Sequence, residues 1–176
     1  MKTKSSISTR KLTFTALFIA LSFVGSYIKI FGTVAFDSLP GFLAALVFGP
    51  IYGAAIGFLG HLFTALSSGF PLSLPMHLAI AVSMALTMYV YGVTYRVISK
   101  KFPEAVTLLI TGIVGILFNA PISLALSIGV LRLIAGWEVA LGLVALLPAL
   151  IIASTANVSI SIILFKSLKN VWNKIM

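Results

Sequence analysis

A few residues could carry polar chemistry in a chain that is otherwise mostly apolar. Asp37 is one of only three acidic residues among 176, and His61 and His77 are the only histidines. A carboxylate and two imidazoles could hold the polar groups of a small molecule by hydrogen bonds, or could move protons in an enzyme. Asn119 and Asn157 add amides within apolar stretches, where a buried amide needs several hydrogen-bond partners.

Several other kinds of site are disfavoured. The chain has no cysteine, so it holds neither a disulfide nor a thiolate metal site, and two histidines alone make a poor metal site. It lacks the G-x-x-x-x-G-K-[ST] phosphate loop, and three acidic residues provide little material for a metal cluster or a proton relay. We therefore expect no catalytic residue, no metal and no cofactor.

Composition indicates the class of protein that must position these residues. Hydrophobic residues make up 60% of the chain and charged residues 9%, and the mean hydropathy is +1.18. These values are typical of an integral membrane protein. The net charge of +9 lies in short clusters between apolar runs, which is a topology signal rather than a nucleic-acid site. We expect an all-α integral membrane protein with a single membrane domain over residues 1–176 and no nucleic-acid partner.

Hydrophobic runs long enough to cross a bilayer need about 20 residues. The basic start MKTKSSISTRK precedes an apolar run that is too long for a signal peptide, so we expect a retained first helix. The stretch 40–68 is either one tilted helix or two short ones that reverse at Gly49–Pro50. The reversal puts all three basic clusters on the cytoplasmic side, together with both termini, and so favours a six-transmembrane-helix bundle. The predicted helices are 12–31, 40–49, 50–68, 75–97, 105–130 and 140–165.

The second of these helices is too short to span alone. Broken helices at membrane depth are tolerated where they are buried in protein or line a cavity, so the break indicates a binding cavity. Polar residues at steps of three and four then mark one face of each neighbouring helix, as Asn119, Ser123 and Ser127 do. We predict an outward-facing pocket roofed by three loops. The predicted ligand-binding residues are Tyr27, Asp37, Ser38, His61, Thr64, His77, Asn119, Trp137, Glu138 and Asn157.

Each of these residues could instead have a purely structural role. Serine and threonine in membrane helices often bond back to their own carbonyls or join helices. The two histidines could be structural hydrogen-bonding groups, Glu138 a solvated loop charge, and Trp137 a residue of the interfacial aromatic belt. Of these residues, Asp37 is the one for which a functional role is favoured most, because it lies in a short loop between a polar helix face and a broken helix.

Taken together, these features resemble a known family. The chain length, the six predicted spans, the Gly–Pro break and the small-residue patch of Ala16 and Ala20 in ALFIA resemble the S components of energy-coupling factor (ECF) transporters. The resemblance covers essentially the whole chain. It implies a multi-pass protein of the prokaryotic plasma membrane that captures a vitamin from outside. It also implies a transmembrane T component and two cytoplasmic ATPases as partners, with Ala16 and Ala20 contacting the T component.

Two stretches, FDSLPGFLAALVFGP and GFLGHLFTALSSGFPLSLPMHLAIA, look most like the members assigned to α-ribazole, a precursor of the cobalamin lower ligand. An uncharged benzimidazole riboside would suit aromatic surfaces and hydrogen-bonding side chains better than a strongly anionic vitamin would. Another vitamin such as pantothenate remains an alternative, since Lys29 or Arg132 could meet its carboxylate. A small membrane enzyme and a channel or scaffold are the competing classes.

Overall fold

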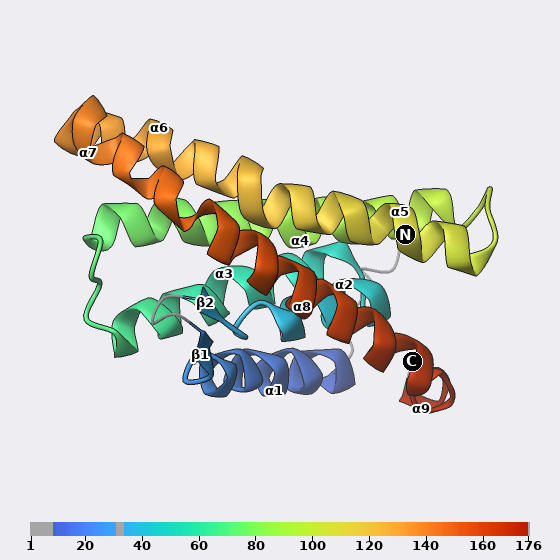
Figure 1. The fold of residues 1–176 in the computed structure, drawn as a ribbon. Helices are drawn as coiled ribbons and strands as arrows, with labels where there is room; N and C mark the ends of the chain where they lie inside the picture. Colours follow the sequence, from blue (N-terminus) through green and yellow to red (C-terminus); the bar gives the residue numbers. More distant parts are fainter. Residues whose placement is uncertain (1–8, 31–33, 176) are drawn as a thin grey trace, which may run out of the picture.

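The computed structural model describes residues 9–30 and 34–175, and nearly all of this part of the chain is helical (Figure 1). The first elements are α1 (Thr9–Gly25), β1 (Lys29–Ile30), β2 (Val34–Ala35), α2 (Leu39–Val47), α3 (Pro50–Ser67) and α4 (Leu74–Ile98). They are followed by α5 (Glu104–Leu117), the π-helical turn η1 (Phe118–Ile122), α6 (Ser123–Ala135), α7 (Trp137–Leu141), the 3-10 turn η2 (Gly142–Leu146), α8 (Leu147–Ser167) and α9 (Lys169–Ile175).

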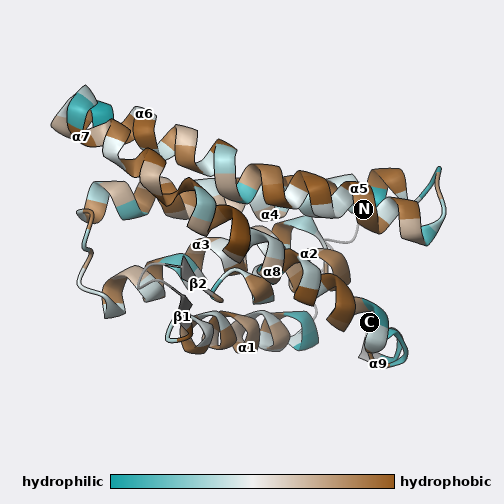
Figure 2. Ribbon diagram, in the orientation of Figure 1, coloured by the Kyte–Doolittle hydropathy of each residue, from teal (hydrophilic) through white to brown (hydrophobic). Residues whose placement is uncertain are grey.

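Four stretches of the described chain are long and apolar enough to cross a membrane. They are Pro50–Ser67, Leu74–Ile98, Glu104–Ala135 and Trp137–Ser167. Figure 2 shows apolar residues along most of these helices and hydrophilic residues mainly near their ends. The predicted all-helical class is therefore confirmed, and these stretches have the length and composition of membrane spans. The count of six crossings and the side on which the termini lie are not established by these four stretches.

Helix α2 forms the centre of the bundle. Its nine residues extend for about 14 Å at about 1.5 Å per residue, too little to cross the hydrocarbon core. Every residue from Pro40 to Val47 is buried, and α2 contacts α1, α3, α4 and α8. The ring of Phe42 meets that of Tyr91 on α4 at 4.9 Å between centroids. A short apolar helix at membrane depth is thus stabilised by protein on every side.

The chain turns from α2 into α3 at Gly49–Pro50. Gly49 has φ +112°, a conformation that favours glycine, and Pro50 begins α3, where its missing N–H costs nothing. The Arg96 side chain on α4 donates a hydrogen bond from Nη2 to the carbonyl of Phe48 at 3.2 Å. A cation at the C-terminus of α2 also meets the negative end of the helix dipole.

Helix α1 ends earlier than the predicted span 12–31. It stops at Gly25, after which β1 and β2 pair as a two-residue antiparallel ladder. The backbone amide of Phe36 donates to the carbonyl of Gly25 at 3.2 Å, and a Cβ on Gly25 would lie 2.6 Å from the Phe36 carbonyl oxygen. This close return of the chain ends the helix and carries Asp37 back to the bundle.

The predicted helix 105–130 extends from Glu104 to Ala135 through η1. Pro121 lies within this turn, and a proline inside a regular α-helix would clash with the carbonyl one turn earlier. The π-helical turn accommodates the proline and keeps α5 and α6 continuous. The predicted helix 140–165 likewise begins earlier, because Trp137 and Glu138, expected in a loop, form α7.

Substituting Gly53 with alanine is expected to lower the stability of the bundle. An added Cβ would lie 2.6 Å from the Cβ of Ala45 and 2.9 Å from its Cα, so α2 and α3 would have to separate. Overpacking of this kind typically costs about 1–3 kcal/mol. Thermal unfolding in detergent measures the effect, with Gly129→Ala on α6 as the matched control, because a Cβ there meets no heavy atom within 4 Å. Equal melting temperatures for both variants would contradict the close contact between the helices.

Candidate ligand-binding site

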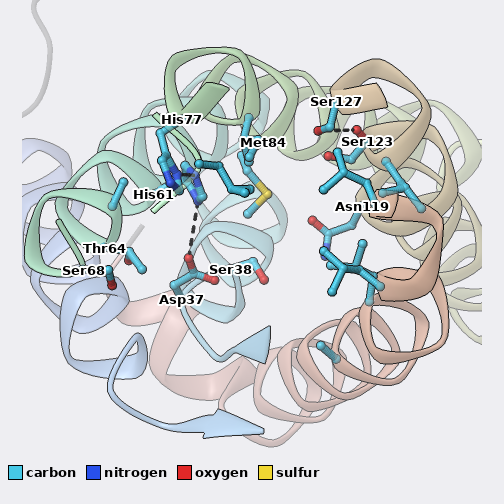
Figure 3. A pocket seen from close by; sticks show the side chains of 18 of the residues that line it. Asp37, Ser38, His61, Thr64, Ser68, His77, Met84, Asn119, Ser123 and Ser127 are labelled. Carbon is cyan, nitrogen blue, oxygen red and sulfur yellow. Dashed lines mark hydrogen bonds and ion pairs between the residues drawn. The ribbon is translucent and has the colours of Figure 1, made fainter. Parts of the chain in front are cut away.

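A cavity of about 340 Å³ lies between α3, α4, η1, α6 and α8 (Figure 3). Its residues on α3 and α4 lie near the turn that joins these two helices, at the end of the bundle that carries α7. Its volume is in the lower part of the range of small-molecule pockets, about 300–1,000 Å³. The residues that line it are Asp37, Ser38, His61, Thr64, Ala65, Ser68, Pro71, Leu72, His77, Ile80, Met84, Asn119, Ser123, Leu124, Ser127, Leu143, Leu146, Leu150, Ala153 and Asn157.

One wall of the cavity is a chain of three polar side chains. His61 Nδ1 lies 3.7 Å from Asp37 Oδ2, and His61 Nε2 lies 3.2 Å from His77 Nδ1. The two imidazole rings stack with centroids 5.4 Å apart, and the ring of Phe70 contacts His77 edge-on at 5.8 Å. The side chains of Asp37 and His61 are only 12% and 13% exposed. Residues from a loop, α3 and α4 are therefore joined into one polar wall (Figure 3).

The facing wall comes from η1, α6 and α8. Asn119 extends from the π-helical turn, and no group of the described chain bonds its buried Oδ1. On α6, Ser123 Oγ accepts a hydrogen bond from Ser83 Oγ on α4 at 2.9 Å, and Ser127 Oγ donates to the Ser123 carbonyl. Asn157 Nδ2 donates to the Ala153 carbonyl at 3.0 Å within α8. Ser83 and Ser123 thus join α4 to α6, whereas Ser127 bonds within α6, and Asn119 Oδ1 has no partner in the described chain.

Leucines from one turn and two helices also line the cavity. Leu143 and Leu146 on η2, Leu150 on α8 and Leu124 on α6 provide an apolar surface opposite α3. Sequence reasoning did not identify these residues, because leucines are common throughout apolar helices and nothing in their spacing separates a cavity wall from a lipid-facing surface. The cavity therefore has polar side chains on both walls and an apolar surface of leucines beside them.

Seven of the ten predicted ligand-binding residues lie together in this lining: Asp37, Ser38, His61, Thr64, His77, Asn119 and Asn157. Their contact with a ligand stays a prediction. The hydroxyl of Thr64 also donates back to the Gly60 carbonyl at 3.0 Å, as membrane-buried threonines commonly do.

The other three predicted residues lie outside the lining. Tyr27 is 66% exposed and packs edge-on against Phe23, one turn earlier in the chain. Trp137 is 52% exposed, and the Arg132 guanidinium lies 4.2 Å from its ring centroid. Glu138, beside it in the first turn of α7, is also exposed. The short helix α7, which the sequence did not reveal, carries these last two side chains away from the cavity.

The charges around the cavity limit the ligands that it suits. Within the described chain, neither lysine nor arginine lines the cavity, and the only carboxylate that does so is Asp37. No group of three or more histidine, aspartate or glutamate side chains in the described part could hold a metal ion. The described lining therefore offers one carboxylate, neutral polar groups and apolar surface, and no basic side chain for an anionic group.

The described part of the chain is a helical bundle with four apolar candidate membrane spans and a cavity of ligand size. The family model of the ECF transporter substrate-specific component matches residues 10–171, and the chain belongs to this family. No curated protein and no solved structure gives a significant match.

Members of this family are transport subunits, which agrees with the expected absence of enzymatic activity. They act with a T component and ATPases, which are therefore the implied partners.

Proposed function

We propose that this chain is the high-affinity binding subunit of an ECF transporter that imports a vitamin or vitamin precursor through a prokaryotic cell membrane. Our best candidate for the ligand is α-ribazole. The proposed binding residues are the seven that line the cavity, with Asp37 and His77 foremost. Tyr27, Trp137 and Glu138, which the sequence also suggested as ligand-binding residues, lie outside the lining and are not part of the proposed site.

The observation that carries this proposal is the cavity itself. Its polar wall offers carboxylate and imidazole groups to ribose hydroxyls, and its leucine wall offers apolar surface to a benzimidazole ring. The lining within the described chain carries no lysine or arginine for an anionic vitamin. Of the two cations that the sequence suggested for pantothenate, Lys29 and Arg132, the side chain of Lys29 is outside the described part, and Arg132 lies against Trp137 outside this lining. These features favour the riboside over pantothenate.

Charge supports a topology of six crossings with both termini in the cytoplasm. The start of α1, the turn between α4 and α5, and α9 lie at one end of the bundle, whereas α7 and the turn between α3 and α4 lie at the other (Figure 1). Basic residues gather in the segments of the first end: Arg10, Lys11, Arg96, Lys100, Lys101, Lys166, Lys169 and Lys174. Under the positive-inside rule this end faces the cytoplasm, so the cavity lies toward the exterior.

Identification of bound small molecules tests the proposal. The chain is purified alone in detergent and denatured, and the released compounds are identified by mass spectrometry. A stoichiometric benzimidazole riboside supports the proposal, whereas another vitamin would keep the transport class and replace the ligand. Chemical conversion of a candidate ligand by the purified chain would instead favour the alternative of a small membrane enzyme.

A further inference from the structure

Two buried hydrogen-bond acceptors face the same cavity from opposite walls. His77 is only 7% exposed, and its Nε2 has no partner in the described chain. Asn119 Oδ1, on η1, is likewise buried without a partner. Figure 3 shows the two side chains on opposite sides of the cavity. Because an acceptor buried without a hydrogen bond is costly, both atoms indicate where a ligand would bind.

The partners of the histidines determine which of their nitrogens carry protons. A carboxylate only accepts, so Asp37 favours the tautomer of His61 that directs Nδ1–H toward it. Neutral His61 then accepts at Nε2, and His77 Nδ1 donates to it across 3.2 Å. This leaves a lone pair on His77 Nε2.

We propose that the ligand enters this cavity as a hydrogen-bond donor at two positions, donating one hydrogen bond to His77 Nε2 and another to Asn119 Oδ1. This inference rests on the proposed binding function and specifies the chemical class of its ligand. The ligand carries at least two hydroxyl or N–H groups, together with apolar surface that meets Met84 and the leucines of the lining. Besides lining the cavity, Asp37 and His61 also position His77, because they keep its Nε2 an acceptor.

The test uses α-ribazole and a series of analogues in which fluorine replaces each ribose hydroxyl in turn. Fluorine keeps a dipole of similar size but removes the donor. Dissociation constants are measured by calorimetry on the full chain in detergent, because neither tryptophan lines the cavity to report binding by fluorescence. We expect two of the analogues to bind the wild-type chain about tenfold more weakly or worse, since each leaves one buried acceptor unpaired.

Two variants show which residue accounts for the weaker binding of each analogue. His77→Phe keeps a ring but removes Nε2, and Asn119→Leu keeps the side-chain shape but removes Oδ1. Each variant is expected to bind α-ribazole more weakly and to stop discriminating against one analogue, while still discriminating against the other. His61→Phe is expected to weaken the discrimination at the His77 position alone, which a merely structural loss would not do.

The outcomes separate this inference from the proposed function. If the wild-type chain binds α-ribazole and binds every fluorinated analogue equally well or more tightly, the two-donor inference is overturned. The proposed binding function is then unaffected. Discrimination that persists unchanged in both His77→Phe and Asn119→Leu also overturns it. Failure of the wild-type chain to bind α-ribazole at all overturns both. If either variant does not fold, the analogue series on the wild-type chain decides alone.

Discussion

Replacing Ala16 and Ala20 together with tryptophan is expected to abolish uptake by the assembled transporter while leaving ligand binding unchanged. Both alanines lie four residues apart on the exposed side of α1, with Leu17 and Leu21 beside them. Small residues let two membrane helices approach closely, and we propose that the T component docks here. Two indole rings would hold the partner helix away from α1, whereas the cavity is lined by residues of other segments.

Uptake of labelled ligand by cells that express the chain with its T component and ATPases measures this effect. The matched control is Ala125→Trp with Gly129→Trp, because these residues are also small, exposed and four apart, but lie on α6. Full uptake is expected for the control. Normal uptake by the Ala16 and Ala20 variant, or equal loss in both variants, would contradict docking at this face.

Asp37→Ala is expected to weaken ligand binding by about tenfold or more without unfolding the protein. The substitution removes the carboxylate that lies 3.7 Å from His61 Nδ1, and so removes the group that orients the histidine pair. Losing a hydrogen-bond partner at a buried site commonly costs about 1–3 kcal/mol, which corresponds to a factor of about five to 150 in affinity. Because Asp37 lies in the loop before α2, the helices themselves stay intact.

Calorimetric titration of the purified variant measures the affinity, and its thermal melting curve reports the fold. Glu104→Ala is the control, since it removes the same charge at the opposite end of the bundle, where Glu104 bonds Lys169 at 3.0 Å. The affinity of this control is expected to stay at the wild-type value. An unchanged affinity in Asp37→Ala would remove Asp37 from the binding site.

The sequence was most informative where polar residues are rare. In an apolar chain, each polar side chain must be satisfied within the protein, so the spacing of His61, Thr64 and Asn119 indicated the helix faces that meet at the cavity. The turn at Gly49–Pro50 was equally visible, because proline disfavours a helical conformation in the residue before it. These signals suggested most of the polar lining.

Other features depend on contacts that no local pattern encodes. The early end of α1 arises where the chain returns against Gly25, and the π-helical turn at Pro121 is an adjustment within an otherwise continuous helix. The leucines of η2 resemble lipid-facing leucines in sequence and are distinguished only by the cavity beside them. Trp137 was expected to bind the ligand because it lies in a predicted loop near the pocket. In the structure it belongs to the short helix α7, outside the cavity lining, and no local sequence pattern indicated that helix.

The most direct test of the central claim is equilibrium dialysis of the purified chain, without its partner subunits, against labelled α-ribazole and a panel of unlabelled vitamins. The account predicts saturable binding of one molecule per chain, displaced by unlabelled α-ribazole and not by pantothenate, and weakened in His77→Phe. Absence of saturable binding for α-ribazole and for every vitamin of the panel would contradict it.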